Sequence, residues 1–162
     1  MSKSSNRKTG WRNGIVLAAG LAIVGGSAAW LLGSQSAAAA DIVVYKDPSC
    51  GCCRQWVDYM RDAGYSVEAR NTRNLPAIKE EHGVPNRARS CHTAIVGGYF
   101  IEGHVPAADV RRLLTERPDI RGLSAPGMPM GSPGMEVPGQ APQPYQVLAI
   151  ANDGKATVFA SH

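Results

Sequence analysis

Three cysteines stand within four residues, directly after a short apolar stretch and directly before a helical pattern. Residues 42–45 are β-branched and aromatic and precede the turn residues 47–49, which predicts a buried strand. From Cys53 onward, apolar residues recur at the spacing of an amphipathic helix that Gly64 ends. Cys50, Cys52 and Cys53 are therefore expected at a helix N-terminus, where the positive end of the helix dipole lowers the pKa of a thiol.

The spacing of these cysteines points to redox or metal chemistry. Cys50 and Cys53 have the C-x-x-C spacing of a thiol–disulfide exchange site, and Cys52 adds a third sulfur between them. Three crowded thiolates repel one another unless they are protonated, oxidised or bridged by soft cations such as Cu(I). The fourth cysteine, Cys91, lies far away in the sequence.

The first 40 residues have the layout of a secretory signal. Four basic residues precede an uncharged run over 15–32, and small residues follow up to a cleavage site at Ala38-x-Ala40. The alternative is an uncleaved N-terminal membrane anchor, because the apolar run is long for a signal. In both cases residues 41–162 are expected to be exported as one domain.

The charge balance argues against a nucleic-acid partner. Removing the four basic residues of the N-terminal segment from the chain's 17 leaves 13 basic residues against 13 acidic ones. The exported part is thus formally neutral, and the basic isoelectric point comes from the N-terminal segment. Four cysteines in an exported chain also allow two structural disulfides, although adjacent cysteines such as Cys52 and Cys53 rarely both serve that purpose.

The order of expected elements predicts a thioredoxin-like α/β fold. A strand over 65–70 and a short helical stripe over 75–82 follow the first helix. Next come a strand over 91–96, the turn Gly97-Gly98, a strand over 99–103 and a helix ended by Pro118. In a thioredoxin-like domain the third strand begins beside the first strand–helix turn, so Cys91 is expected to face the three clustered cysteines.

The C-terminal part adds two features to this single domain. Residues 126–135 are rich in proline and glycine and contain Met128, Met130 and Met135, so they predict a loop that lies across the domain. Two strand-like runs, 145–151 and 156–160, surround the turn 152–155 and predict a β-hairpin.

Several motifs occur together in this chain: the cysteine cluster, residues 90–93, 96–99 and 102–106, and the two Pro-Gly-Met segments within 126–135. With these motifs the chain resembles the CopG-type family of exported bacterial proteins, a former domain of unknown function found among copper-resistance proteins. The resemblance covers residues 42–162 and implies a periplasmic, thioredoxin-like domain that binds copper, with a proposed copper redox role. It assigns the ligands to four cysteines: Cys50, Cys52, Cys53 and Cys91.

Three interpretations of the cysteines remain open at this point. The preferred one is a Cu(I) pocket that contributes to copper resistance, with several ions bridged by thiolates and with other periplasmic copper-handling proteins as partners. The alternative is a thiol–disulfide oxidoreductase in which Cys50 attacks and Cys53 resolves, and the third is a structural role.

Four histidines complete the candidate ligands. His92 follows Cys91 and His104 opens the third helix, so each is a candidate extra metal ligand. Alternation along a strand favours His104, because a Cys91 that faces inward turns His92 away. His82 is expected to pack or cap its helix, and the three loop methionines are soft donors that can also act as filler.

Overall fold

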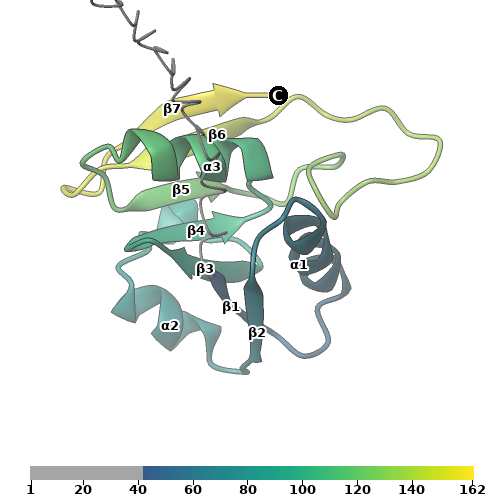
Figure 1. Cartoon of the computed structure of the whole chain (residues 1–162), viewed down its shortest axis with the longest axis horizontal. Coiled ribbons are helices and arrows are strands. Elements are labelled where there is room, and N and C mark those ends of the chain that lie inside the picture. The colour runs from purple at the N-terminus through teal and green to yellow at the C-terminus, as the bar shows by residue number, and fades with distance from the viewer. Residues whose placement is uncertain (1–41) are drawn as a thin grey trace, which may run out of the picture. The chain divides into compact units, whose positions relative to one another are not determined.

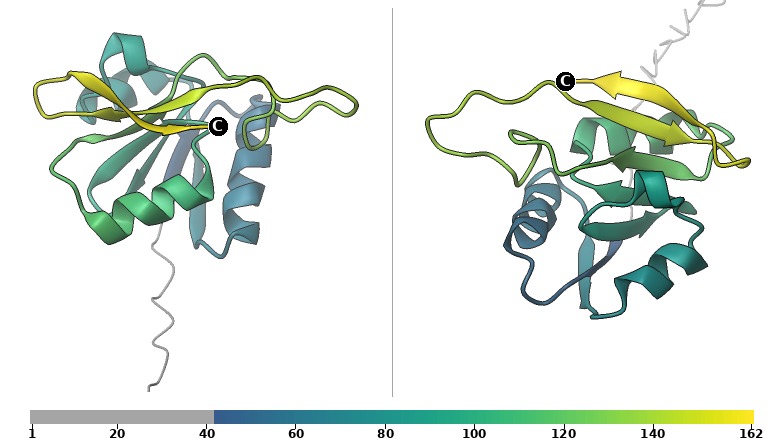
Figure 2. Two further views of the ribbon diagram at one scale, coloured as in Figure 1. Left: turned by 90° about the horizontal axis from the view of Figure 1, so that it is seen from above. Right: turned by 180° about the vertical axis from the view of Figure 1, so that it is seen from behind.

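The computed structural model describes residues 42–162, which form an α/β domain around one mixed sheet of seven strands (Figures 1 and 2). The strand order is β2-β1-β3-β4-β5-β6-β7. The expected signal or anchor segment, residues 1–40, lies outside the described residues. Within the described part of the chain, no helix has the length and apolar character needed to span a membrane.

The first three elements form a parallel β-α-β unit, as predicted. Strand β1 (Ile42–Lys46) pairs in parallel with β2 (Val67–Asn71), and helix α1 (Gly51–Asp62) connects them. Gly64 follows the helix with φ of 93°, a backbone conformation that glycine adopts without a Cβ penalty. The apolar stripe of α1, which includes Trp56 and Met60, is buried against the sheet.

The next elements complete the thioredoxin-like arrangement. Helix α2 (Leu75–Glu81) and a 3-10 turn, η1 (Asn86–Ala88), lead into β3 (His92–Val96). Strand β3 pairs antiparallel with both β1 and β4 (Tyr99–Gly103), and α3 (Ala107–Glu116) follows β4. Gly97 and Gly98 form the predicted hairpin turn with φ of 56° and 90°, the conformation of a type I′ turn.

A fifth strand joins the C-terminal hairpin to this core. Strand β5 (Gly122–Ala125) pairs in parallel with β4 and antiparallel with β6 (Gln146–Ile150), which in turn pairs with β7 (Ala156–Ser161). The hairpin was predicted from the sequence, whereas β5 was not. The four residues of β5 are too few to show an alternation of apolar and polar side chains. Gly122 allows the close pairing with β4, because a Cβ at this position would lie 2.0 Å from the Phe100 carbonyl oxygen.

The two faces of the sheet differ in what covers them (Figure 2). Helices α1 and α3 cover one face and bury the main hydrophobic core, which includes Trp56, Ile101 and Leu113. Helix α2 and η1 cover the other face over a smaller cluster with Val84 and Phe100. The long loop 126–145 leaves the end of β5 and passes beside the N-terminal end of α1, while its tip, residues 136–144, is exposed (Figure 1).

Candidate metal centre

The clustered cysteines lie at the N-terminus of α1, as expected. Cys50 is the N-cap residue, and its Sγ accepts a hydrogen bond of 3.3 Å from the backbone N–H of Cys53. Cys50 and Cys53 form a disulfide, and the Cys52 Sγ lies 3.6 Å from the Cys50 Sγ. Cys50 and Cys52 are partly exposed, whereas Cys53 is fully buried. This turn therefore holds one oxidised pair with a free thiol beside it.

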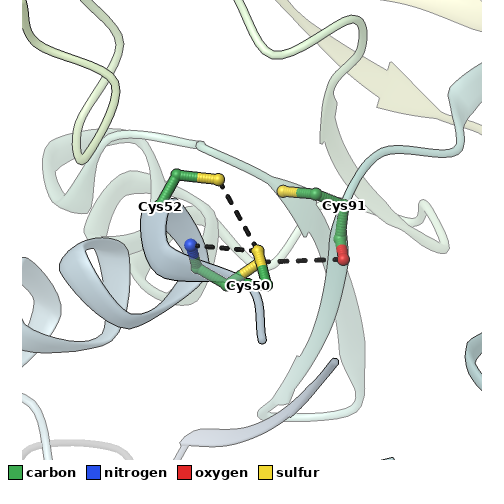
Figure 3. A group of neighbouring side chains, drawn as sticks. Cys50, Cys52 and Cys91 are labelled. Atoms are coloured by element: carbon green, nitrogen blue, oxygen red, sulfur yellow. Dashed lines mark hydrogen bonds between the residues drawn. A yellow bond between two sulfur atoms is a disulfide. The ribbon is translucent and has the colours of Figure 1, made fainter. Parts of the chain in front are cut away.

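The fourth cysteine reaches this cluster from the segment that precedes β3. All four Sγ atoms lie within 4.8 Å of one another. In Figure 3 the sulfurs of Cys52 and Cys91 point toward each other from the two segments. The Cys91 carbonyl oxygen lies 3.8 Å from the Cys53 Sγ. The expected convergence of Cys91 on the clustered cysteines is present in the fold.

His104 lies at the end of β4 with one ring nitrogen directed at the cysteines. Its Nδ1 is 2.8 Å from the Pro133 carbonyl oxygen, which has no proton to give, so Nδ1–H is the donor. In the neutral ring the other nitrogen, Nε2, then carries a lone pair, and it lies 3.1 Å from the Cys91 Sγ. The Cys91 thiol can donate to this nitrogen, and a metal can replace that proton.

His92 also reaches Cys91, although strand alternation made it the slightly less favoured of the two candidate histidines. The His92 Nδ1 lies 3.3 Å from the Cys91 Sγ, and its ring packs 4.6 Å from the Trp56 ring. Cys91 precedes the first residue of β3, so the alternation that holds inside a strand does not separate the two side chains. The donor atoms of Cys91, His92 and His104 lie within 4.8 Å of one another.

Burial determines the protonation of the group formed by Cys91, His92 and His104. Burial, and then the neighbouring Cys52, raises the pKa of the Cys91 thiol to about 12. Burial lowers the pKa of His92 well below its ordinary value and also lowers that of His104. At neutral pH both imidazoles are therefore neutral and can offer lone pairs. The sequence predicted lowered thiol pKa values for the clustered cysteines, but two of these are in a disulfide and do not titrate.

The loop 126–145 supplies site contacts that the sequence did not predict. Pro133 orients His104 through its carbonyl oxygen, a backbone interaction that leaves no signal in the sequence. Gly134 packs on α1 so closely that a Cβ would lie 2.8 Å from the Trp56 backbone nitrogen and 3.1 Å from the Cys52 carbonyl oxygen. Trp56, part of the buried stripe of α1, also packs its ring against that of His92.

The remaining candidates have other surroundings. His82 is the C-cap of α2, in agreement with its predicted capping role, and His162 contacts the Asp109 carboxylate at 2.8 Å. Met128 is 44% exposed, and Met130 and Met135 are half-buried. A metal contact by these methionines stays a prediction.

Two solved structures resemble the chain over nearly their whole length. One, described as copper resistance protein copG, Form 2, is 42% identical with a TM-score of 0.73, and the match covers 76% of this chain and 98% of that one. The chain belongs to the CopG-type family. A second structure, described as Form 1 of the same copper resistance protein, is 43% identical with a TM-score of 0.71 and covers 75% and 96% of the two chains.

A family model described as a protein of unknown function, DUF411, matches residues 88–135 of this CopG-type chain, from η1 to the Pro/Gly/Met loop. A comparison with curated proteins found no match. The matched segment contains Cys91, His92, His104 and Pro133.

Proposed function

We propose that this CopG-type protein binds Cu(I) in the pocket formed by Cys50, Cys52, Cys53 and Cys91 and contributes to copper resistance. The observation that carries the proposal is the approach of all four Sγ atoms to within 4.8 Å of one another from two separate segments. The copper-resistance descriptions of the two similar structures support it. Copper is here the cargo of the protein.

The donor set matches the chemistry of monovalent copper. Thiolates are soft ligands that select Cu(I), and several ions that share bridging thiolates offset the repulsion among the sulfurs. Cys50 and Cys53 become thiolate ligands only after an external dithiol reductant supplies two electrons to the S–S bond and is itself oxidised to a disulfide.

His104 and His92 are proposed as additional ligands. The buried Nε2 of His92 has no hydrogen-bond partner among the described residues, and the Nε2 of His104 is oriented toward Cys91. The His92 nitrogen that faces the Cys91 Sγ is Nδ1, at 3.3 Å, and it is the atom placed to share a metal with that sulfur. The unpartnered Nε2 leaves one polar atom of the same buried ring unsatisfied.

The test is copper retention by the full chain. We expect the protein, reduced and purified without oxygen, to retain Cu(I) through gel filtration, with the metal-to-protein ratio measured by mass spectrometry. Cys52→Ala should lower that ratio, whereas Gln55→Ala, which changes an exposed residue of the same helix, should not. A wild-type protein that emerges free of copper would refute the proposal.

The disulfide supports a second candidate, a thiol–disulfide oxidoreductase. The partly exposed Cys50 thiolate would attack a substrate disulfide and release one substrate thiol, and the buried Cys53 would then attack Cys50, forming the Cys50–Cys53 disulfide and releasing the second thiol. Cys52 or Cys91 would relay the oxidising equivalents onward. This candidate predicts insulin reduction that survives Cys52→Pro, since proline is tolerated in a first helical turn. The copper proposal predicts that Cys52→Pro sharply weakens metal retention.

The location follows as part of the same proposal. Residues 1–40 would direct residues 41–162 to the bacterial periplasm as a cleaved signal or an anchor, and contact with a membrane would come only from that segment. Other periplasmic copper-handling proteins are then the expected partners. Fractionation of cells that express the full chain, with immunodetection of the mature mass, tests this assignment.

A further inference from the structure

A buried polar cluster lies behind the pocket, on the α2 side of the sheet. Glu102 on β4 is fully buried and forms an ion pair with the nearly buried Lys79 of α2. Thr93 lies opposite Glu102 in the β3–β4 register and donates a hydrogen bond of 2.7 Å to its Oε2. The Lys79 ammonium also donates to the Thr93 Oγ1 at 3.0 Å. This cluster contains no cysteine or histidine and has no role in the copper proposal so far.

Glu102 also holds the segment that carries the fourth cysteine. Its Oε1 accepts a hydrogen bond of 2.5 Å from the backbone N–H of Ser90, the residue before Cys91. Gly103 leaves the space for this approach, because a Cβ at that position, where φ is 72°, would lie 2.5 Å from the Ser90 Oγ. Cys91 precedes β3 and so lies outside its regular pairing. The bond to Glu102 therefore restrains the backbone directly before Cys91.

The same carboxylate is linked to the second half of the pocket. His104 follows Glu102 by two residues at the end of β4. Because Glu102 is part of β4 and accepts the Ser90 N–H, it connects β4, which His104 directly follows, to the segment that carries Cys91. The Cys91 Sγ and the His104 Nε2 lie 3.1 Å apart, and they come from the two segments that Glu102 connects.

We infer that Glu102 is a positioning residue of the metal pocket, which acts by accepting the Ser90 N–H and so sets where the Cys91 sulfur lies. The expected change in copper affinity rests on the proposed function. The position of the Cys91 sulfur can be tested separately, in the metal-free protein. A buried ion pair is by itself weak support for stability, since apolar pairs of similar volume often replace it without loss. The bond to Ser90 is the contact that an apolar pair does not reproduce.

The experiment compares two double variants of the full chain that differ in this one bond. Lys79→Met with Glu102→Leu removes both charges and the acceptor, whereas Lys79→Met with Glu102→Gln removes both charges but keeps an amide oxygen for the Ser90 N–H. Far-UV circular dichroism and melting temperature show whether each variant folds. Glu68→Gln, in the exposed Glu68–Arg70 pair of β2, is the matched control for loss of a carboxylate.

The first readout needs no copper. With the Cys50–Cys53 disulfide intact, Cys52 and Cys91 are the thiols that iodoacetamide can alkylate, and mass spectrometry follows each rate. We expect the Leu-containing variant to change the alkylation rate of Cys91 by at least about fivefold, while the alkylation rate of Cys52 stays within about twofold of the wild type. In the Gln-containing variant both rates should match the wild type. Equal Cys91 rates in all variants, or equal changes in both doubles, would overturn the inference.

The second readout is Cu(I) affinity by competition with a chromophoric chelator. The Leu-containing variant should bind Cu(I) about tenfold more weakly than the wild type, the loss expected when a residue that orients a metal ligand is removed. The Cu(I) affinities of the Gln-containing variant and of Glu68→Gln should stay within about threefold of the wild type. If wild-type protein binds no copper, the function proposal fails while the alkylation result still decides the role of Glu102.

A second variant keeps the inference testable if the Leu-containing double does not fold. Ser90→Pro removes the N–H donor and leaves the Lys79–Glu102 pair in place, and Ser90→Ala retains the donor as its control. Arg89, the preceding residue, has φ of −68° and ψ of 140°, the conformation that precedes proline without a clash. We expect Ser90→Pro to change the Cys91 alkylation rate as the Leu-containing double does. An unchanged rate in Ser90→Pro would overturn the inference on its own.

Discussion

The two halves of the pocket are built in different ways. The first half is one turn of sequence, in which Cys50, Cys52 and Cys53 share the N-terminus of α1 and two of them form a disulfide. The second half combines Cys91, His92 and His104 from the segment before β3, from β3 and from beyond the end of β4. The first half is partly exposed, whereas both histidines of the second are fully buried.

Because of this difference, oxidation and reduction change the donors of the first half, whereas the donors of the second half are held in place in both states. The helix-borne half changes its ligands when the disulfide forms or breaks, because a disulfide sulfur is not a thiolate. The strand-borne half keeps its donors in both states, since Pro133 orients His104 and the core surrounds His92. Cys91 belongs to both groups of donors, so it should matter more than any other ligand.

The largest expected effect comes from removing this shared sulfur. Cys91→Ser should weaken Cu(I) binding by the reduced protein roughly a hundredfold, about 2.7 kcal/mol, because the sulfur that it removes lies within 4.8 Å both of the other three sulfurs and of the histidine donors. Cys52→Ser removes a donor from the helix-borne half alone and should cost about tenfold. Competition with a Cu(I) chelator measures both affinities. A larger loss for Cys52→Ser than for Cys91→Ser would contradict the view that the halves share Cys91.

The second effect concerns the stability of the strand-borne half without metal. Burial lowers the pKa of His92 well below 6.5, so the unfolded chain takes up a proton below that pH while the folded protein does not. The free energy of unfolding should therefore be level above about pH 6.5 and fall as the pH drops below it, by at most about 1.4 kcal/mol per pH unit for this one proton. His104 acts in the same direction.

Urea unfolding at pH 7.5 and pH 5 measures this slope. His92→Phe should reduce the difference between the two pH values, because the variant has no proton to take up at this position. His82→Phe, at the C-cap of α2 and outside the pocket, is the matched control for replacing a histidine by phenylalanine. A slope that persists in full in His92→Phe would show that other groups cause the acid sensitivity.

The smallest expected effect tests the loop that orients His104. Gly134→Ala places a Cβ 2.8 Å from the Trp56 backbone nitrogen, so the loop must shift and the Pro133 carbonyl must move relative to His104. Gly139→Ala is a matched control, because its φ of 79° is nearly that of Gly134, at 80°, and a Cβ there meets no atom within 4 Å. Backbone strain is common to both variants.

The difference between these two variants isolates the contact with α1. Gly134→Ala should lower Cu(I) affinity about tenfold more than Gly139→Ala, roughly 1.4 kcal/mol. The same competition assay measures both affinities. Equal affinities would mean that the loop does not position His104.

Most of the fold could be predicted from the sequence because its signals are local. The apolar stripe of α1, Gly64 after it and the Gly97-Gly98 turn each predicted the element that the structure contains. Strand β5 was missed because its four residues carry no alternation, and its pairing with β4 depends on Gly122 and on the neighbouring strands. Local patterns do not encode such a context.

The sequence by itself determined that three sulfurs meet at one helix end, because adjacent residues in a helical turn cannot separate. It also indicated, through the order of elements, that Cys91 would join them. Only the tertiary structure decided that both histidines contact Cys91, that the carbonyl of Pro133 sets the tautomer of His104, and that Glu102 holds the segment before Cys91. Except for the contact between the neighbours Cys91 and His92, these contacts join residues 12 or more positions apart in the chain. The contacts of Pro133 and Ser90 use backbone atoms, so no pattern of side chains predicts those two.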